Sequence, residues 1–339
     1  MRTLITGGAG SLGTALTKRL LDLQGEVAIY SRDEYKHHVL AEKFKGQEDR
    51  LRFYLGDVRD VDRLWYAARS CDRIIHAAAL KRIDTCEYNP TEAIDTNVGG
   101  SENVVDVALK LRIDALLVSS DKAVDPINTY GATKMLAERQ FTKAHHLAGG
   151  DTPRFVIVRY GNVLGSRGSV IHAFNKRHTP GKPLVVRSAD ATRFFMRMSN
   201  AVELVLAALE GGKTGEVWIP LLTATTVEDI ARYFTGWEAF THGRAIIETG
   251  LHPGEKKHEA LWREGEEGLG VVMPNPLNGG YLLVCPDKAS RDARQWSDTL
   301  PTDYEMLCRT SDVALRTDGN VLRSAIEEEL ACPSDYPFD

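Results

Sequence analysis

The sequence predicts an α/β fold, in which helices cover both faces of a doubly wound parallel sheet and a smaller C-terminal domain follows. Two observations lead to this prediction. Short apolar runs alternate with helical patterns five times before a sixth run at Phe155–Tyr160, and such alternation is typical of βα units in one parallel sheet. After about residue 165 the elements become shorter and loops more frequent. We therefore expect one domain over residues 1–165, to which some later segments return, and a second region over residues 166–339.

The composition is that of an ordinary globular protein, with 339 residues, 43% of them hydrophobic, and a formal net charge of −5. No basic stripe suggests nucleic acid as a partner, and no run approaches the roughly 18 apolar residues of a membrane span. The chain starts directly on an apolar strand, Thr3–Ile5. We therefore expect no signal peptide and a cytoplasmic protein.

The cysteines and histidines give no sign of a disulfide framework or a metal site. The ten histidines show no HxH or HExxH spacing, and the five cysteines contain no CxxC pair. Widely spaced cysteines are typical of reduced thiols in a cytoplasmic protein, and we predict no metal. These cysteines are Cys71, Cys86, Cys285, Cys308 and Cys332.

The first strand, residues 3–6, runs into a glycine-rich turn and then into a helical pattern. Strand, glycine turn and helix in this order are the Rossmann-type context of a dinucleotide fingerprint. Gly7 permits the tight turn, Gly10 lets the backbone approach a pyrophosphate, and Gly13 allows close helix packing. Backbone N–H groups at the start of the helix then face the phosphates; the first helical residues are Ser11 and Leu12.

The second strand, Glu26–Tyr30, ends in Ser31, Arg32 and Asp33. An NAD site favours an acid at this strand tip, where it binds the ribose 2′-hydroxyl. A hydroxyl and a guanidinium suit a 2′-phosphate instead. NADP is therefore the favoured cofactor, and NAD, with Asp33 on the ribose, is the alternative.

The third and fourth strands, Leu51–Leu55 and Asp72–His76, end at the same edge of the predicted sheet. Asp57, which precedes Val58, either bonds an adenine amine or caps the next helix. Small residues after the fourth strand let a cofactor lie against the strand end. These residues are Ala77, Ala78 and Ala79.

Two polar residues follow these small ones. Lys81 faces the same cleft, where it would meet a substrate phosphate. Asn97 begins a helix that returns to the central strand, and it either caps that helix or braces the catalytic loop. The sequence leaves these two roles of Asn97 open.

Acid and base groups gather after the fifth strand, in the motifs Ser119-Ser120-Asp121-Lys122 and Tyr130 to Lys134. Tyr130 and Lys134 are four residues apart, so on a helix they share one face. A lysine ammonium near a phenol lowers its pKa and makes a base that works near neutral pH. Asp121 and Lys122 add a carboxylic acid and an amine, which is more than a simple alcohol oxidation needs.

Charged residues also stand out in the C-terminal region. Together they would supply positive charge and one ribose-binding acid, Glu255, for a nucleoside diphosphate. They are Arg187, Arg193 and the segment from Gly250 to His258. Beyond them we expect amphipathic helices over residues 200–210 and 227–234, a strand at 280–284 and an acidic helix near 326–330.

Taken together, these residues resemble the extended short-chain dehydrogenase/reductase family, and within it the UDP-N-acetylglucosamine 4,6-dehydratases that invert C5. The resemblance runs from residue 3 to about residue 260. It implies a UDP-linked nucleotide sugar as substrate and a homo-oligomeric assembly. The most specific pieces are His76–Lys81, Ser119–Asn128, Arg159–Gly168 and Pro253–Lys256. The resemblance assigns Tyr130, Lys134, Tyr160, Asn162 and Val163 to the cofactor, and Asn162, Ser169, Val170, Arg187, Arg193, His252 and Glu255 to the substrate.

The resemblance also implies an internal redox cycle. Tyr130, activated by Lys134, removes the proton from the sugar 4-hydroxyl, which Ser120 hydrogen-bonds, while hydride passes from C4 to NADP. Lys122, kept neutral by its surroundings, takes the C5 proton, and Asp121 protonates the departing 6-hydroxyl. Hydride returns to C6 and C5 is reprotonated from its other face, giving a 4-keto-6-deoxy sugar nucleotide.

The chain departs from the family pattern at two positions. Ser120 stands where the family usually has threonine, so the hydroxyl is kept. His252 stands where the family usually has arginine, and a bidentate phosphate contact is lost at neutral pH. The alternatives to the dehydratase are a nucleotide-sugar 4-epimerase, a C5-retaining dehydratase, which needs only the Ser/Tyr/Lys set, and a non-catalytic NADP-binding protein.

Overall fold

The computed structural model describes residues 1–149, 153–179, 182–236, 246–266, 269–273, 280–292, 310–311 and 319–331. Cys308 and Cys332 lie outside these residues. Cys71, Cys86 and Cys285 are buried free thiols. No helix in the described ranges is long and apolar enough to cross a membrane.

The described chain is built on a nine-stranded sheet with the order β13-β14-β10-β6-β5-β4-β1-β2-β3. Seven strands from β3 to β10 are parallel, and β14 and β13 close the sheet as antiparallel partners. The strands are β1 (Arg2–Thr6), β2 (Glu26–Ser31), β3 (Leu51–Leu55), β4 (Arg73–His76), β5 (Asp114–Val118), β6 (Phe155–Val158), β10 (Val217–Pro220), β13 (Gly270–Met273) and β14 (Tyr281–Val284).

Side chains of the central strands are buried on both faces of this sheet. Leu4 and Ile5 of β1 are both 0% exposed, yet they belong to two different hydrophobic clusters. Successive residues of a strand point to opposite faces, so the two clusters are the cores above and below the sheet. Continuous apolar runs such as residues 115–118 are therefore what a parallel sheet covered on both faces requires.

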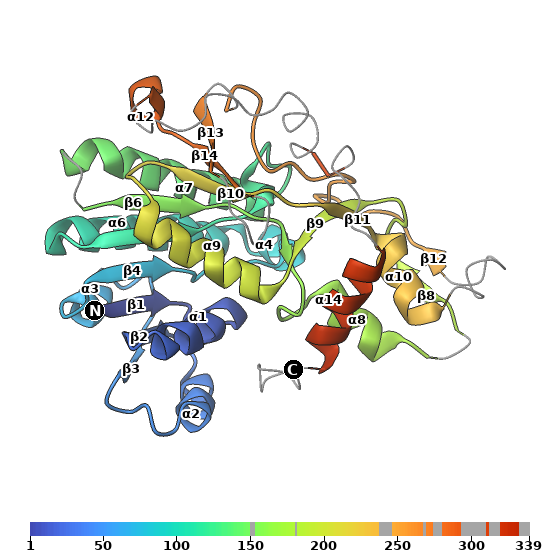
Figure 1. Ribbon diagram of the computed structural model, residues 1–339, viewed down its shortest axis with the longest axis horizontal. Helices are drawn as coiled ribbons and strands as arrows, with labels where there is room; N and C mark the ends of the chain where they lie inside the picture. Colours follow the sequence, from blue (N-terminus) through green and yellow to red (C-terminus); the bar gives the residue numbers. More distant parts are fainter. Residues whose placement is uncertain are drawn as a thin grey trace.

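Helices cover the two faces of the sheet as layers (Figure 1). Helices α3, α6 and α7 pack together on one face, and α1 and α9 contact each other on the other face. The helices of this part are α1 (Ser11–Asp22), α2 (Glu34–Lys43), α3 (Val61–Ala68), α4 (Ile83–Tyr88), α5 (Pro90–Ala93), the π-helix η1 (Ile94–Gly99), α6 (Gly100–Leu111), the 3₁₀ helix η2 (Asp121–Ala123), α7 (Thr129–Ala148), α9 (Met198–Gly211) and α12 (Lys288–Asp292).

A smaller lobe lies beside the carboxyl ends of the strands, at the right of Figure 1. Its buried residues form a separate hydrophobic cluster that runs from Leu164 to Ile326 along the chain. The C-terminal helix packs there against α10. The lobe and the strands that join it to the sheet comprise β7 (Asn162–Val163), α8 (Val170–Arg177), β8 (Leu184–Val186), β9 (Thr192–Met196), β11 (Ala224–Thr226), α10 (Val227–Thr235), β12 (Ile246–Glu248) and α14 (Gly319–Ala331).

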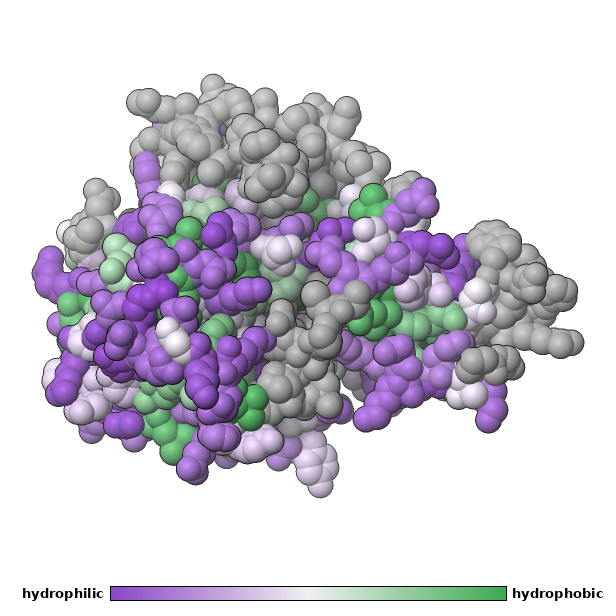
Figure 2. All heavy atoms as spheres, turned by 60° about the horizontal axis from the view of Figure 1, so that its bottom comes forward, coloured by the Kyte–Doolittle hydropathy of each residue, from purple (hydrophilic) through white to green (hydrophobic). Residues whose placement is uncertain are grey.

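The predicted α/β fold is confirmed, with the six N-terminal strands within one or two residues of their expected bounds. The later strands β10, β14 and β13 return to the main sheet, so the second region does not form one continuous unit. On the face in Figure 2, hydrophilic residues cover most of the coloured surface and apolar residues gather only in small groups. Most large apolar side chains are instead in the cores described above.

Candidate active site

A large cavity lies at the carboxyl ends of the parallel strands. It is lined by Gly7 after β1, Ser31 at the end of β2, Ala77 after β4, Ser119 after β5 and Tyr160 after β6. Its volume is about 2130 Å³, whereas a pocket for one drug-sized ligand has roughly 300–1,000 Å³. The cavity therefore has room for two ligands side by side. We call it the strand-end cavity.

The glycine-rich turn and the N-terminus of α1 form one wall of the cavity. A Cβ atom on Gly13 would lie 2.5 Å from the backbone of Gly8, so only glycine lets the helix pack this closely on the turn. Gly10 is the N-cap of α1 and no side chain caps the helix there. The N–H groups of the first turn, at Ser11 and Leu12, are thus left for a ligand, which fits the pyrophosphate of a dinucleotide.

The tip of β2 presents cations to the cavity. Arg32 Nη1 lies 3.5 Å from Asp57 Oδ2, and Ser31 Oγ is 2.6 Å from His37 Nε2. The carboxylate of Asp33 caps α2, because it accepts the backbone N–H of Lys36 at 3.0 Å and pairs with the Lys36 amine at 2.9 Å. The acid that would bind a ribose hydroxyl is therefore already engaged.

Asp57 and Val58 line the cavity beyond β3. The sequence left open whether Asp57 caps the next helix, and the structure gives that role to Asp60, whose carboxylate accepts the N–H of Arg63. Asp57 instead accepts two hydrogen bonds from the Arg59 guanidinium at 2.7 and 3.0 Å. Burial raises the pKa of the Asp57 carboxyl, but the bonds from Arg59 lower it by more, so it stays below its ordinary value.

Ala77, Ala78, Ala79 and Lys81 follow β4 along the cavity wall. The Lys81 amine donates to the backbone carbonyl of Arg167 at 2.8 Å. Arg167 in turn donates to the carbonyl of Ala9 at 2.6 Å, so it lies over the glycine-rich turn. Arg167 was not among the site residues expected from the sequence, although its place after the sixth strand was a signal for it.

Asn97, which the sequence places near the cofactor site, is not among the residues that line the cavity. It is 1% exposed within η1. Its side-chain oxygen accepts the N–H of Leu80 at 2.8 Å, and its amide donates to the Leu80 carbonyl and to Thr133 Oγ1, each at 2.9 Å. Every amide atom is thus used to tie the loop after β4 to α7. The sequence left open whether Asn97 caps its helix or braces the catalytic loop, and its hydrogen bonds instead join the loop after β4 to α7.

Tyr130 and Lys134 lie on α7, which starts at the catalytic loop. The side chain of Asn128 caps this helix by accepting the N–H of Gly131 at 2.7 Å. A Cβ atom on Gly131 would lie 2.2 Å from the carbonyl oxygen of Lys122. Glycine at this position therefore lets the first turn of α7, with Tyr130, approach the backbone of Lys122.

The positive charge that lowers the pKa of the Tyr130 phenol belongs to Lys122, whereas the sequence predicted Lys134 for this role. Burial raises the pKa of Tyr130 to about 12, while the charge of Lys122 and a hydrogen bond with Ser120 act in the opposite direction. The Lys134 amine donates to the carbonyl of Val118 at 2.6 Å. Burial lowers the pKa of Lys134 to about 8, although the carboxylate of Glu138 opposes this shift.

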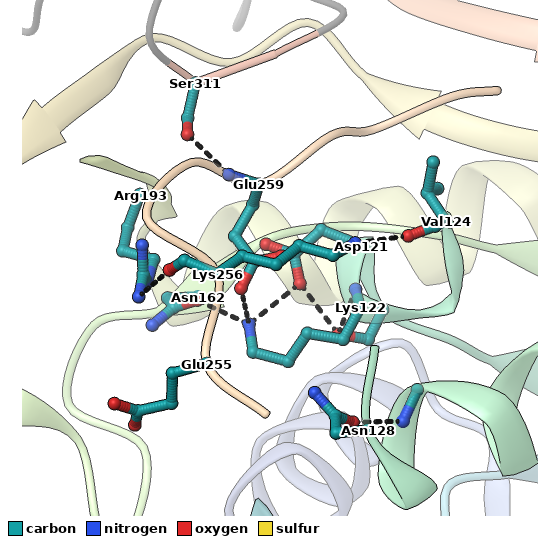
Figure 3. Close-up of polar contacts among 12 residues, drawn as sticks. Asp121, Lys122, Val124, Asn128, Asn162, Arg193, Glu255, Lys256, Glu259 and Ser311 are labelled. Carbon is teal, nitrogen blue, oxygen red and sulfur yellow. Dashed lines mark hydrogen bonds and ion pairs between the residues drawn. The ribbon is translucent and has the colours of Figure 1, made fainter. Parts of the chain in front are cut away.

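Ser120, Asp121 and Lys122 form a hydrogen-bonded group after β5, and Figure 3 shows the contact between Asp121 and Lys122. Asp121 Oδ1 accepts from Ser120 Oγ at 2.9 Å and from Lys122 Nζ at 3.0 Å. Asp121 is 0% exposed and does not line the cavity, whereas Ser120 and Lys122 do. The carboxyl group that was expected to act as the acid therefore lies behind the lysine amine.

The expectation that its surroundings keep Lys122 neutral does not hold in this structure. Besides Asp121, Glu259 Oε1 lies 3.4 Å from Lys122 Nζ. Burial lowers the pKa of the Lys122 ammonium, but the two carboxylates raise it by more, so it lies above its ordinary value. Glu259 also lines the cavity. The sequence gave no signal for it, because only the tertiary fold brings it to Lys122.

The expected substrate residues lie on the lobe side of the same cavity. Arg187 pairs with Glu255, and the Arg193 guanidinium donates to the carbonyls of Lys256 and Lys257 at 2.9 Å. The hydroxyl of Ser169, before α8, is buried without a hydrogen-bond partner among the described residues. The remaining expected residues on this wall are Tyr160, Asn162, Val163, Val170 and His252.

The fold and the site together define the class of protein: an extended short-chain dehydrogenase/reductase, with a dinucleotide turn and a Tyr/Lys pair at one strand-end cavity. The chain belongs to the polysaccharide biosynthesis protein family, which it matches over residues 3–276.

Curated relatives carry two kinds of name. A UDP-N-acetylglucosamine 4,6-dehydratase (inverting) from Campylobacter jejuni is 40% identical over 287 residues, which are 84% of this chain and 82% of the relative. A UDP-glucose 4-epimerase from Rickettsia akari is 40% identical over 291 residues, which are 82% of this chain and 84% of the relative.

Solved structures share the fold. The X-ray structure of Pen from Bacillus thuringiensis has a TM-score of 0.84 and 31% identity, and the match covers 97% of both chains. A dTDP-glucose 4,6-dehydratase from Streptomyces venezuelae, solved with NAD and TYD bound, has a TM-score of 0.63 and 23% identity, covering 76% of this chain and 86% of that one.

Proposed function

We propose that this protein is a nucleotide-sugar 4,6-dehydratase that acts on UDP-N-acetylglucosamine or a close relative and inverts C5. The observation that carries the proposal is the Asp121–Lys122 pair, whose lysine lines the strand-end cavity beside Tyr130 while Asp121 lies behind it. This pair adds an acid and a base to the Ser/Tyr/Lys set, and loss of water across C5 and C6 needs both. The inverting dehydratase among the relatives supports the same function.

Cations on the cavity wall support a nucleoside diphosphate as the substrate handle. Arg177, Arg187 and Arg193 line the lobe side, and Lys81 lines the opposite side. Guanidinium groups bind phosphate oxygens with paired hydrogen bonds. The free hydroxyl of Ser169 at the start of α8 adds a donor for the same groups. Glu255, held by Arg187, is in place to accept ribose hydroxyls.

The nicotinamide cofactor, when bound, supplies hydride acceptance from C4 and hydride return to C6. Tyr130 takes the proton of the 4-hydroxyl, with its phenolate stabilised by the charge of Lys122 and by Ser120. The Lys122 ammonium passes one proton to Asp121 across their 3.0 Å contact, which creates an amine base and a carboxylic acid in one step. The amine removes the C5 proton. The proton held by Asp121 reaches the departing 6-hydroxyl through the hydroxyl of Ser120, which is hydrogen-bonded to Asp121 and lines the cavity. Lys122 and Asp121 end in their starting charge states. Hydride addition at C6 is completed by a proton that C5 takes from its other face, which balances the proton that Tyr130 removed from the 4-hydroxyl and releases to solvent.

NADP is the cofactor that the tip of β2 favours. Arg32 is exposed at the cavity edge, and Asp33 is engaged as the cap of α2. A 2′-phosphate would gain the guanidinium, whereas Asp33, the acid expected to bind a free ribose, is engaged with Lys36. Fluorescence titration should therefore give a lower Kd for NADPH than for NADH, and Arg32→Ala should remove the difference.

A homo-oligomer and a cytoplasmic location are parts of the same proposal. Apolar residues are exposed around α7: Tyr88 is 88%, Ile94 49% and Leu136 45% exposed. Burying such residues against a second copy would be favourable. Light scattering coupled to gel filtration should give a mass above that of one 37.5 kDa chain.

Proton NMR of the reaction products separates the dehydratase from its alternatives. Incubation with UDP-N-acetylglucosamine and NADP should convert the 6-hydroxymethyl signals into those of a 6-methyl group, and the H5 couplings should report the inverted centre. A product with its hydroxymethyl group intact and C4 inverted would show the 4-epimerase instead, which the epimerase names among the relatives make the second candidate. Binding of nucleotide without any product would leave a non-catalytic protein.

A further inference from the structure

The amine of Lys122 lies between two buried carboxyl groups (Figure 3). Its Nζ atom is 3.0 Å from Asp121 Oδ1 and 3.4 Å from Glu259 Oε1, and it also donates to Asn162 Oδ1 at 3.4 Å. The Asp121 side chain is 0% exposed and that of Glu259 3% exposed. Asp121 supplies the acid of the proposed reaction, and the function above has no use for Glu259.

Each carboxyl group keeps one oxygen without a partner. Asp121 Oδ2 and Glu259 Oε2 are buried and accept no hydrogen bond within the part of the chain that the structure describes. A buried acceptor without a donor costs about 1–3 kcal/mol. One ammonium and two carboxylates in one buried place also leave one negative charge, which only the neighbouring Arg193 guanidinium offsets among the groups that face Lys122. A cluster of this kind lowers the stability of the folded protein. Its presence in the site therefore points to a role in the chemistry.

Glu259 is held from outside the catalytic loop. Its backbone N–H donates to Ser311 Oγ at 2.8 Å, and the Ser311 N–H donates to the Glu259 carbonyl at 2.8 Å. Ser311 Oγ is also 2.7 Å from Thr192 Oγ1. The C-terminal part of the chain thus fixes the backbone of Glu259 against β9.

The same segment is tied to the catalytic loop on both sides of Glu259. The Lys256 amine donates to the carbonyl of Val124 at 2.6 Å, and the Arg263 guanidinium donates to the carbonyl of Ala123 at 2.7 Å. Glu259 therefore has a fixed position relative to Lys122. A flexible amine held this way has few orientations left, and proton transfer to carbon depends steeply on orientation.

We propose that Glu259 is a positioning residue that holds the Lys122 amine in line for proton removal at C5. This inference rests on the proposed function, since it assigns Glu259 to the dehydration half of that reaction. The other charged and titratable groups that face Lys122 are Asp121, Arg193 and Tyr130. Glu259 acts only through the amine. C4 oxidation uses Tyr130 and needs only the positive charge of Lys122, which Asp121 also favours, so it depends little on Glu259.

The test compares Glu259→Leu with Glu259→Gln, and uses Glu264→Gln as the matched control, because Glu264 is exposed on the same segment. Glu259→Leu should lower kcat for water loss about 100-fold with little change in KM. The single-turnover rise of reduced nicotinamide absorbance, which reports C4 oxidation, should stay within about twofold. Glu259→Gln, which keeps an acceptor for the amine, should restore part of the lost rate, and Glu264→Gln should match the wild type.

A second measurement reports on Lys122 without any turnover. Glu259→Gln removes one carboxylate that stabilises the ammonium, so the pKa of Lys122 should fall. The rate at which acetic anhydride labels Lys122, read by peptide mass spectrometry across a pH series, should then rise in this variant and not in Glu264→Gln. Equal labelling curves, or equal losses in C4 oxidation and water loss, would overturn the proposal. A wild-type protein that removes no water from any nucleotide sugar would instead refute the proposed function, and the labelling result would still decide the role of Glu259.

Discussion

Lys122 is the residue on which the proposed chemistry depends most. The sequence places it beside Asp121 and predicts a neutral amine, but the structure pairs it with two carboxylates that favour the ammonium. The base and the acid can nevertheless arise together, because one proton moved from Lys122 to Asp121 produces both. Lys122 and Asp121 therefore function as a pair, and neither residue can do this chemistry alone.

Lys122→Arg separates the charge of this residue from its basicity. Arginine keeps a cation between Asp121 and Glu259, but it is not deprotonated in proteins. We expect water loss to fall by about 10²- to 10⁴-fold, the usual contribution of a general base, while C4 oxidation persists. Stopped-flow absorbance of the reduced nicotinamide and mass spectrometry of the sugar measure the two steps. Water loss at the wild-type rate would show that another group removes the C5 proton.

The sequence revealed those site residues whose neighbours along the chain carry the chemistry. Tyr130 and Lys134 are linked by helical spacing, and the glycine turn by its place between a strand and a helix. Glu259 could not be predicted as a site residue, because Lys122, which it contacts, lies on a distant segment of the chain. Asn97 and Asp121 show a second limit of sequence-based prediction. A motif places a polar residue near a site, but only the folded structure shows whether its side chain lines the cavity or is buried behind it.

At the scale of elements, β4 is tied to its neighbours through a buried histidine. His76 is 1% exposed; its Nδ1 is 2.7 Å from Thr6 Oγ1 of β1 and its Nε2 is 3.1 Å from Ser101 Oγ of α6. Burial, aided by the charge of Lys134, lowers the pKa of His76 to about 3. The ordinary value in an unfolded chain is about 6.5.

This shift predicts how stability depends on pH. Below about pH 6.5 the His76 side chain is protonated in the unfolded chain but stays neutral in the folded chain. The contribution of His76 to the free energy of unfolding is therefore complete above that pH and is lost as the pH falls toward 3. Between pH 6.5 and pH 5 the loss should be about 2 kcal/mol. Urea denaturation at several pH values measures it, and His76→Gln should show a shallower fall. Parallel curves for the two proteins would contradict the assignment.

A buried ion-pair network joins β6, α7 and the segment that carries Glu259. Arg159 is 0% exposed and donates to Glu138 at 2.8 Å and to Glu266 at 2.7 Å. Glu138 also accepts the hydroxyl of Ser119 at 2.6 Å. The network thus lies directly behind the catalytic loop and holds its backbone.

Arg159→Leu should destabilise the protein by about 3–5 kcal/mol, because the buried carboxylate of Glu138 loses its closest cation and keeps only Arg263 at 3.6 Å. The matched control is Arg82→Leu, which breaks an exposed pair with Asp84 and should cost less than about 1 kcal/mol. Midpoints of urea unfolding compare the two. Similar small losses in both variants would show that the network contributes little.

The elements were largely predictable from the sequence. Apolar runs and glycine turns located the first six strands, because the central strands are buried on both faces and must be apolar throughout, and the partly buried edge strand β3 still has four apolar or aromatic residues out of five. Short strands such as β7 and β11 lack enough residues to show a period, and their pairing depends on partners far along the chain. The strand at residues 281–284 was expected, but its antiparallel place beside β10 follows from tertiary packing.

At the scale of the whole molecule, two parts of the chain share one cavity. The sheet supplies the glycine-rich turn and the catalytic loop, and the lobe, which lies beside the strand ends in Figure 1, supplies the arginines of the opposite wall. The C-terminal region contributes more than the sequence suggested: α14 packs into the lobe, and Ser311 fixes Glu259. Sequence patterns could not show this, since a lone serine carries no signal of its own.

The most direct test of the central claim, that this cavity performs an internal redox dehydration, is mass spectrometry of UDP-N-acetylglucosamine after incubation with the protein and NADP in heavy water. We predict loss of one water, one deuterium on the sugar carbon skeleton at C5, and no net reduced cofactor, because the hydride taken from C4 returns to C6. A sugar nucleotide of unchanged mass that is inverted at C4 would contradict the account and establish the epimerase.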